Sequence, residues 1–398
     1  MEKVKALVSE HFGVEALSIK KMAGYESLNY LVKTKEAKYV FKHYLNDGEI
    51  GAQLLAESEV LLKLSEAFPT LYPHSILAKD GNYVIALDNA EHIRLLTFLE
   101  GTLLAETVQT PTLLTSFGQF LARMDQALLG HKSITLEARK INWDLQYCLR
   151  NQRLAYAIES PNKRKIVDYY FLQFRECVLP HITYLRKSVI HNDANDWNVL
   201  CEGDKVSGII DFGDMVYAPL INELAIALMY VMVEVEQPIQ AATTVIKAYH
   251  NILPLQEKEL DCLFYLIAGR LCTSVCNSAY GRQENPDNAY ISVSEKGAWA
   301  LLETFLTINP IFATNEFKKA CGFEVLIEED MSKEIERRNH YFSKALSLSY
   351  KEPIKMHSST DGPFDNVLKM KPPLCFTKQN ADRVVAEIDR ILRGVSDG

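Results

Sequence analysis

The stretch KSVIHNDANDWNVLCEGDKVSGIIDFGD, residues 187–214, decides how this sequence is interpreted. Two short apolar runs in it end on polar residues: VIHND closes at Asp193, and GIIDFG becomes polar at Asp211. Asn198 follows Asp193 by five residues. Asn and Asp favour turns, so any one of these residues would also fit an ordinary polar turn between strands. The joint spacing, with an apolar run beside each half, predicts two strand-end loops whose side chains act together.

The pattern of these loops, H-x-D-x-x-x-x-N followed by D-F-G, is typical of sites that transfer a phosphoryl group. Such a group carries charge that metal ions neutralise, and magnesium prefers carboxylate and amide oxygens. We therefore expect Asn198 and Asp211 to hold magnesium, and Asp193 to be the catalytic base that orients an acceptor hydroxyl and takes its proton late. His191 is interpreted as a scaffold residue that bonds the loop backbone, with a role as base as the alternative.

A nucleotide site also needs a cation near the phosphates, held in place by a carboxylate. Lys42 in the strand-like YVFKHY is the expected cation, and it should share a strand face with Val40. The helical segment that follows offers Glu57 and Glu59. We prefer Glu57, because it lies on the same helical face as the apolar residues after it. A solvated lysine and a solvated glutamate are the alternatives.

Two further segments are expected to contact the nucleotide. The stretch AGYESLNY, residues 23–30, precedes Lys42 and has one glycine. Its Ser27 and Asn29 could bond phosphate oxygens, although an ordinary hairpin turn fits equally well. The stretch LLTFLEG, which ends at Gly101, is expected to place the backbone from Thr97 to Leu99 at the adenine edge.

The order of the patterns predicts an α+β fold with two lobes, of the protein-kinase-like kind. Residues 1–99 read as a small β-rich, nucleotide-binding N-lobe with one inserted helix at 51–68. Residues 100–325 read as a larger helical C-lobe, interrupted by the strand-like stretch that holds the catalytic and metal loops. Residues 326–398 form a separate C-terminal segment.

These residues resemble the aminoglycoside phosphotransferase and choline kinase superfamily, over residues 15–310. The most specific parts are VIHNDANDWNVL, GIIDFGDM and LTFLEG. The sequence departs from protein kinases, because no A-P-E segment follows and the helical NELAIALMYVM comes almost at once. HNDAND, RLLTFLEG and the distal RLCTSVCNSA resemble the hydroxylysine kinase and homoserine kinase branch. This resemblance implies an ATP- and magnesium-dependent kinase that phosphorylates amino alcohols.

The end of the chain resembles a class-III, pyridoxal-phosphate-dependent aminotransferase of the phospho-lyase kind. RRNHYFSKALSLSYKEPIKM is similar to its beginning, and SSTDGPFDNVLKMKPPLCFTKQNADRVVAEIDRIL to its end. The middle with the cofactor lysine is absent, so pyridoxal phosphate is not expected on this chain. We interpret residues 331–398 as the remnant of a kinase and lyase fusion, with a kinase-specific extension as the alternative. Such a lyase removes phosphate from phosphorylated amino alcohols, which favours a hydroxylysine-, homoserine- or ethanolamine-like acceptor.

The ammonium group of such an acceptor would need a carboxylate or an aromatic face. Asp196, Trp197, Asp214 and Glu223 lie near the motif and are the candidates. Arg270 could pair with a substrate carboxylate if there is one. For each of them alone, a structural polar residue is the more frequent explanation.

Composition and charge limit the classes of partner that this chain is expected to bind. The chain of 398 residues has a net charge of −8 and no basic stripe, which argues against nucleic acid. No apolar run follows a basic start, and the longest apolar stretch, 220–233, is interrupted by Asn222 and Glu223. We therefore expect no membrane partner and a cytoplasmic location. A homodimer is kept open, because a predicted amphipathic helix at 381–392 needs an apolar partner surface.

Two other functions remain as alternatives. One keeps the fold and changes the acceptor to an aminoglycoside or another antibiotic. The other is a catalytically idle kinase-like module that binds a partner.

Overall fold

The structure is a computed structural model whose chain divides into two units, Met1–Val325 and Leu326–Gly398. It describes residues 1–22, 24, 27–45, 50–284, 295–325, 357–361, 367–371, 382 and 384–386. The first unit holds every candidate site residue named above.

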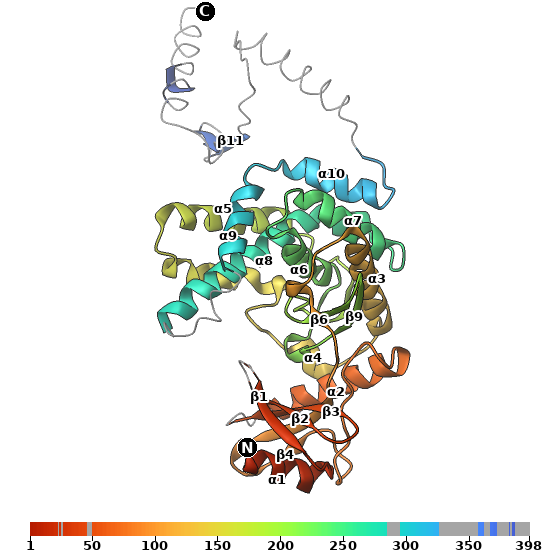
Figure 1. The fold of residues 1–398 in the computed structure, drawn as a ribbon. Coiled ribbons are helices and arrows are strands. Elements are labelled where there is room, and N and C mark those ends of the chain that lie inside the picture. The colour runs from red at the N-terminus through yellow and green to blue at the C-terminus, as the bar shows by residue number, and fades with distance from the viewer. Residues whose placement is uncertain are drawn as a thin grey trace, which may run out of the picture. The chain divides into compact units, whose positions relative to one another are not determined.

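The first unit begins with a five-stranded antiparallel sheet in the order β1-β2-β3-β5-β4 (Figure 1). Its strands are Ser18–Met22 (β1), Leu28–Lys33 (β2), Lys38–Tyr44 (β3), Ile85–Ala86 (β4) and His92–Thr97 (β5). Three helices and a short turn belong with it: Glu2–Leu7 (α1), the π-helical Val8–Phe12 (η1), Ile50–Ala67 (α2) and Asp88–Ala90 (η2). We call this set the N-lobe.

The two faces of the sheet pack differently. Phe41 and Ile93 are fully buried in a small core with Val8 of η1. Val40, one residue from Phe41, packs instead against the large core that includes Leu61 of α2. Strand alternation thus places Val40 and Lys42 on the face toward α2 and the helical part, as predicted. The helix at the N-terminus was not predicted, since this stretch was assigned to a mainly β region.

The remainder of the first unit, which we call the C-lobe, is mostly helical and surrounds the predicted strand-like stretch. Its helices are Leu104–Glu106 (η3), Pro111–Leu128 (α3), Ile134–Ala138 (α4), Leu145–Ala157 (η4), Pro161–Cys177 (α5), Phe212–Asp214 (η5), Ile221–Met232 (α6), Pro238–His250 (α7), Glu257–Glu284 (α8), Glu295–Phe305 (α9) and Pro310–Ala320 (α10). Its strands are Thr102–Leu103 (β6), Lys187–Ile190 (β7), Val199–Glu202 (β8), Lys205–Ile209 (β9) and Val216–Pro219 (β10). β7 pairs with β10, and β8 lies between β6 and β9. The β-rich start and helical continuation confirm the predicted α+β architecture, whereas the lobe boundary at residue 99 stays a prediction.

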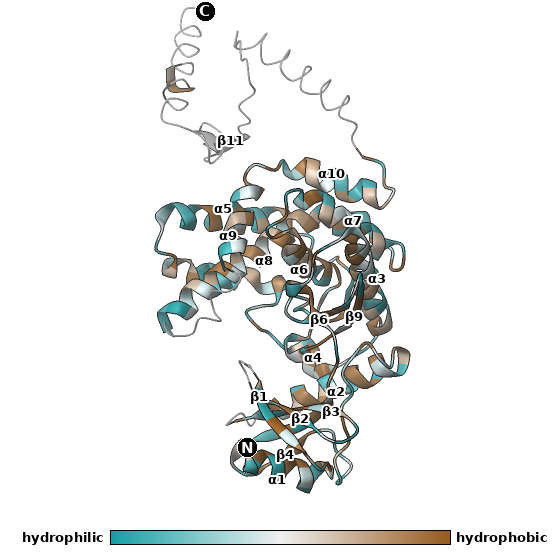
Figure 2. Ribbon diagram, viewed as in Figure 1, coloured by the Kyte–Doolittle hydropathy of each residue, from teal (hydrophilic) through white to brown (hydrophobic). Residues whose placement is uncertain are grey.

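The core of the C-lobe is built around α6 and α8. Every residue of α6 is buried except Tyr230, and Figure 2 shows the hydrophobic ribbon along this helix and the strands beside it. Within the described residues, α8 is the one helix long and apolar enough to cross a membrane, but 89% of its apolar window is buried inside the protein. A long core helix has the same length and composition.

A second described unit contributes only a hairpin and a few helical residues. His357–Asp361 (β11) pairs antiparallel with Val367–Lys371 (β12). Most of the aminotransferase-like sequence and most of the predicted helix at 381–392 lie outside the described residues. The resemblance to an aminotransferase therefore stays a prediction.

A buried hydrogen bond to a carboxylate joins two helices of the C-lobe core. Asp125 of α3 is fully buried and accepts a 2.5 Å hydrogen bond from the Tyr249 hydroxyl of α7. Burial and the nearby Glu223 carboxylate raise the pKa of Asp125 well above its usual range. Burial and a neighbouring negative charge both disfavour the charged form, so we expect Asp125 to hold a proton in the folded protein.

Asp125→Asn is expected to stabilise the protein more at about pH 8 than at about pH 5. Because the pKa of Asp125 is raised in the folded state, the free energy of unfolding falls as the pH rises above the pKa of this carboxyl in the unfolded chain. Asparagine does not titrate, so the variant does not lose this stability. Each kcal/mol gained should raise Tm by about 2 °C in a unit of this size. Thermal melts at both pH values test this, with the exposed Asp204→Asn as control. A lower Tm at both values would contradict it.

Candidate active site

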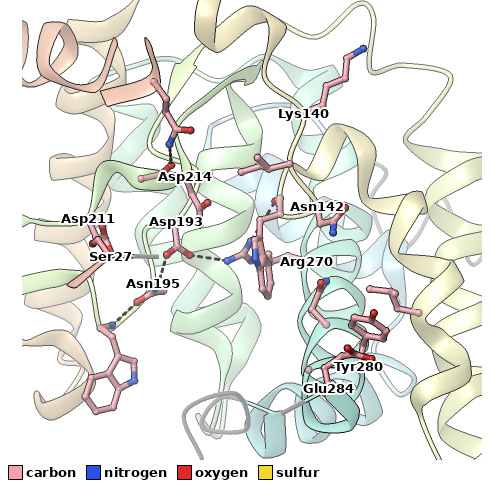
Figure 3. A pocket seen from close by; sticks show the side chains of 18 of the residues that line it. Ser27, Lys140, Asn142, Asp193, Asn195, Asp211, Asp214, Arg270, Tyr280 and Glu284 are labelled. Carbon is pink, nitrogen blue, oxygen red and sulfur yellow. Dashed lines mark hydrogen bonds and ion pairs between the residues drawn. The ribbon is translucent and has the colours of Figure 1, made fainter. Parts of the chain in front are cut away.

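A cavity of about 1170 Å³ is lined by residues of both lobes. Nine of the predicted site residues line it: Ser27, Asn29, Lys42, Glu57, Asp193, Trp197, Asp211, Asp214 and Arg270. Figure 3 shows Asp193 between Asp211 on one side and Arg270 on the other, with Glu284 farther along α8. The motif residues and the N-lobe candidates therefore share one site, although they lie far apart in the sequence.

Asp193 is held on both of its carboxylate oxygens. Its Oδ1 accepts a hydrogen bond from Arg270 Nη2 at 2.9 Å. Its Oδ2 accepts from Asn195 Nδ2 at 2.9 Å and from Asn198 Nδ2 at 2.8 Å. The side chain keeps 20% of its surface exposed to the cavity. A carboxylate fixed from three directions and open on one side can present a lone pair to a bound hydroxyl in one orientation.

Asn192 gives the loop before Asp193 its shape. It adopts a left-handed backbone conformation with φ of 66°, which Asn tolerates better than most residues. Its backbone N–H donates to Glu223 Oε2 at 2.9 Å, and its Nδ2 donates to the Asp214 carbonyl at 3.1 Å. One residue thus ties the Asp193 loop to α6 beneath it and to the turn after Asp211.

His191 is a scaffold residue, as predicted. Its Nε2 lies 3.1 Å from the Ile210 carbonyl, and its Nδ1 accepts a hydrogen bond from the Asp193 N–H at 3.2 Å. The ring also packs edge-on against Phe212 at 4.6 Å. Burial lowers the pKa of His191 to about 4, so the ring is neutral and donates through Nε2. With both nitrogens committed to backbone, His191 fixes the two loops relative to each other.

Asp211 forms an ion pair with Lys42 across the lobes. Asp211 Oδ1 lies 2.8 Å from Lys42 Nζ, and 54% of the Asp211 side chain is exposed to the cavity. The Lys42 charge lowers the pKa of Asp211. Burial disfavours the charge of Lys42, but Asp211 and Tyr44 together outweigh burial, and the pKa of Lys42 is raised. Both groups are therefore charged at neutral pH.

The donors suited to a metal ion are Asp211 and Asn198. The Nδ2 of Asn198 is used by Asp193, which leaves its Oδ1 as the free acceptor of that side chain. Asn198 is 9% exposed and lies behind Asp193 rather than among the cavity-lining residues. Among the described residues there is no cluster of three or more metal-binding His, Cys, Asp or Glu side chains. Two oxygen ligands fit magnesium, which usually takes its other ligands from phosphates and water.

Glu57 lines the cavity, whereas its neighbour Glu59 is exposed; a role of Glu57 in nucleotide binding stays a prediction. Its partner differs from the expected lysine. Glu57 Oε2 lies 2.5 Å from Arg94 Nη2 of β5, and both side chains are 1% exposed. Gln53 links this pair to the metal loop, because its Nε2 donates to the Gly213 carbonyl at 3.0 Å and lies 3.5 Å from Glu57 Oε1. Arg94 and Gln53 were not predicted.

The turn between β1 and β2 brings Ser27 and Asn29 to the cavity. Ser27 Oγ donates to Asn29 Oδ1 at 2.8 Å. A Cβ at Gly24 would lie 2.4 Å from Asn29 Nδ2 and 2.5 Å from the Ser27 carbonyl. Any larger residue at position 24 would collide with Asn29 and Ser27, which explains why the segment has a glycine at this position.

Besides Asn198, four predicted residues do not line the cavity. The Thr97 amide donates to His74, and Leu99 packs near Gly208, so their contact with adenine stays a prediction. Two substrate candidates were wrong in position. Asp196 is half-buried outside the cavity, with its carbonyl bonded to the Ala105 N–H. Glu223 is fully buried under the Asp193 loop, because the first turn of α6 points it into the core.

The end of the cavity beyond Asp193 is lined by aromatic and polar side chains. Arg270 is 2% exposed, stacks on the Trp143 ring at 4.7 Å, and lies 3.4 Å from the Tyr230 hydroxyl. Further lining residues of this end were not predicted, among them Lys140, Asn142, Arg153, Tyr156, Asn277, Tyr280 and Glu284. Those from α8 recur at helical spacing after Arg270, a signal that could have identified them.

The comparisons with known proteins agree with this geometry. Residues 19–260 match the family model described as the phosphotransferase enzyme family, which is more than half of the chain. The chain belongs to this phosphotransferase family. The predicted resemblance of residues 15–310 to this family and the prediction of a small-molecule kinase are confirmed.

Two curated relatives and one solved structure are similar to this phosphotransferase. A hydroxylysine kinase of Xenopus laevis is 31% identical over 75% of this chain and 87% of that protein. A homoserine kinase of Methylobacillus glycogenes is 27% identical over 60% of this chain and 71% of that protein. The structure of a microcompartment-associated aminopropanol kinase matches with a TM-score of 0.62 and 16% identity, over 77% of this chain and 98% of that one, which confirms the kinase-like fold.

Proposed function

We propose that this phosphotransferase transfers the γ-phosphate of ATP to the hydroxyl of an amino alcohol that also carries a carboxylate, such as hydroxylysine or homoserine. The observation that carries the proposal is the Asp193 carboxylate, held by three donors and open to a cavity that also contains the Lys42–Asp211 pair. Phosphoryl transfer requires little of the protein besides positioning and charge, and these residues offer both.

The nucleotide side is assigned to the N-lobe wall and the Asp211 turn. Asn198 and Asp211 would hold magnesium, which supplies neutralisation of phosphate charge. Lys42 is the cation for the phosphates, and Ser27 and Asn29 line the same wall. Lys42 bonds Asp211 Oδ1, so magnesium would share this carboxylate with Lys42 or replace it there, and Lys42 would then be available to a phosphate oxygen.

On the acceptor side, Asp193 receives the hydroxyl. Oδ2 already accepts from two amide groups, whereas Oδ1 accepts only from Arg270 and keeps one lone pair. The acceptor hydroxyl donates to Oδ1, its oxygen bonds the γ-phosphorus as the bond to the β-phosphate oxygen breaks, and its proton passes to Asp193. Arg270 keeps the carboxylate oriented during this step.

The charge along the far end of the cavity favours an acceptor with an amino-acid head. Asn277 and Glu284 follow Arg270 by seven and fourteen residues, which is about 10 and about 21 Å along α8. Asn277 Nδ2 bonds Asn151 and the Thr273 carbonyl, so its Oδ1 is left to accept from an ammonium. Arg153, two residues after Asn151, supplies a cation for a carboxylate.

Acceptor screening tests the proposal. Consumption of ATP should be measured with hydroxylysine, homoserine, ethanolamine, aminopropanol and an aminoglycoside, and the product identified by phosphorus NMR. We expect the highest kcat/KM with hydroxylysine or homoserine. Binding of magnesium-ATP with no turnover of any acceptor would sink the proposal in favour of an idle binding module.

The cavity volume favours one second candidate. The cavity volume of about 1170 Å³ exceeds the range of roughly 300–1,000 Å³ that is usual for a site of one small ligand. The nucleotide would occupy part of this volume. A larger polycationic acceptor of the aminoglycoside kind would use that space. A higher kcat/KM for the aminoglycoside in the same screen would favour this candidate.

Arg153→Met is expected to raise KM for carboxylate-bearing acceptors by about 10- to 100-fold, the value of a lost charged hydrogen bond, and to leave kcat nearly unchanged. Ethanolamine, which has no carboxylate, should show no change. Arg150→Met is the matched control, since Arg150 stacks on Tyr147 at 4.4 Å and does not line this cavity. An equal effect on ethanolamine would exclude carboxylate recognition.

Arg270→Met is expected to move the acid limb of the kcat/KM profile to higher pH. Burial raises the pKa of Asp193 to about 7, and the Arg270 charge counteracts burial. Without that charge the pKa of Asp193 should rise by about one pH unit or more, and the carboxylate would be protonated at neutral pH. Arg270→Lys, which keeps the charge, should show a smaller change. An unaltered limb in folded Arg270→Met would rule out this role.

A further inference from the structure

Three side chains form one row across the N-lobe sheet. Asn29 of β2 is the register partner of Lys42 in β3, and Lys42 is the register partner of Arg94 in β5. Directly opposite residues in antiparallel strands point to the same face, so Arg94 lies beside Lys42 on the face toward α2. Arg94 is 1% exposed and Lys42 is 12% exposed. Two neighbouring cations therefore lie on this face of the sheet, and Lys42 is the one that lines the cavity.

Arg94 is committed to Glu57 and Tyr44. Its Nη2 lies 2.5 Å from Glu57 Oε2 and donates to the Tyr44 hydroxyl at 2.9 Å. Its guanidinium also lies over the Tyr44 ring at 5.6 Å. Burial disfavours the charge of Arg94, but Glu57 and Tyr44 together outweigh burial, and the pKa of Arg94 is raised, so the pair is ionic.

We propose that Arg94 is a positioning residue that holds Glu57 in place of the strand lysine, and so releases Lys42 for Asp211 and the phosphates. This inference rests on the proposed ATP-dependent activity. It explains why, among the described ion pairs, Lys42 contacts Asp211 and not Glu57. Glu57 in turn lies 3.5 Å from Gln53 Nε2, which donates to the Gly213 carbonyl, so Glu57 held by Arg94 also supports the turn that carries Asp211.

Stabilisation alone does not account for the pair. A buried ion pair usually contributes little net stability, because desolvation offsets its attraction. Arg94 Nε and Nη1 are also buried without a hydrogen-bond partner in the described part of the chain. Such a partly satisfied network is costly compared with apolar side chains of similar volume. A role in holding Glu57 gives a reason for this arrangement that core packing does not.

A double-mutant cycle tests the inference on the full chain. The variants are Arg94→Met, Glu57→Leu, the double variant and Arg94→Lys. For each, Tm, the Kd for magnesium-ATP by equilibrium dialysis and the magnesium dependence of kcat are measured. Because Arg94 acts through Glu57, both single variants and the double variant should lose magnesium-ATP affinity equally, by about tenfold. Arg94→Lys should recover part of it.

The outcomes separate the inference from the proposed function. Arg94→Met leaves Glu57 buried without its cation and could fail to fold; the double variant removes both charges and keeps the test readable. A folded double variant with wild-type magnesium-ATP affinity, or single losses that add, would overturn the role of Arg94. Absence of kinase activity in the wild-type chain would overturn the proposed function, while the affinity cycle still measures Arg94.

A matched control exists in the C-lobe. Arg186 Nη2 lies 2.7 Å from Glu259 Oε2, and Glu259 is fully buried, but neither residue lines the cavity. The variants Arg186→Met and Glu259→Leu should change Tm and leave the Kd for magnesium-ATP unaltered. A loss of affinity equal to that of the Arg94 variants would assign the effect to general destabilisation.

Discussion

Asp193→Asn is expected to lower kcat by about 10²- to 10⁴-fold, the range usual for a lost general base. The amide keeps the shape of the side chain, but it cannot take the proton of the acceptor hydroxyl. Magnesium-ATP should still bind with a Kd close to that of the wild type, because the proposed nucleotide and metal contacts belong to Lys42, Asn198 and Asp211 rather than to Asp193. Steady-state kinetics with the best acceptor, together with equilibrium dialysis, measure both quantities.

Asp196→Asn is the control for this variant. Asp196 lies three residues along the same loop and is half-buried outside the cavity. Its replacement should leave kcat within a few-fold of the wild type. If Asp193→Asn kept wild-type turnover, or if the two variants lost activity equally, the assignment of Asp193 as base would fail.

Asp211→Asn should have an effect of similar size through a different step. Charge neutralisation by a metal contributes several kcal/mol, so loss of its carboxylate ligand should lower kcat/KM for ATP by about 10³-fold. The variant also removes the anion that raises the pKa of Lys42, so that pKa should fall. A magnesium titration should show half-saturation at a much higher concentration.

The exposed Asp204→Asn, which removes only a contact with Thr110, is the control for the metal assignment. It should titrate with magnesium as the wild type does. An Asp211→Asn variant with unaltered magnesium dependence would show that the metal is held elsewhere.

The part of the site that the sequence predicted is the part with local spacing. Asp193, Asn198 and Asp211 lie on two consecutive loops, and short strands fix the distance between those loops. Lys42 was predictable because strand alternation alone decides its face. The small β-rich and larger helical parts followed equally from periodicity.

The residues that were missed depend on how distant segments meet. Arg94 reaches Glu57 because β5 pairs with β3, and a single sequence does not state that register. Asn277 and Arg153 line the cavity because α8 packs against η4. Glu223 was misplaced for the opposite reason. It is near the motif in sequence, but the direction of α6 turns it into the core, where it serves the loop backbone.

The aromatic lining of the cavity has a consequence for how this protein can be observed. Trp143 and Trp197 line the cavity, one under Arg270 and the other 43% exposed at its surface. Trp299, which completes the set of three, is 6% exposed beneath Lys163 and does not line the cavity. Indole emission is sensitive to polarity and to nearby charge, so two emitters change with occupancy while the third stays constant. The chain thus carries its own optical reporter of ligand binding, with an internal reference.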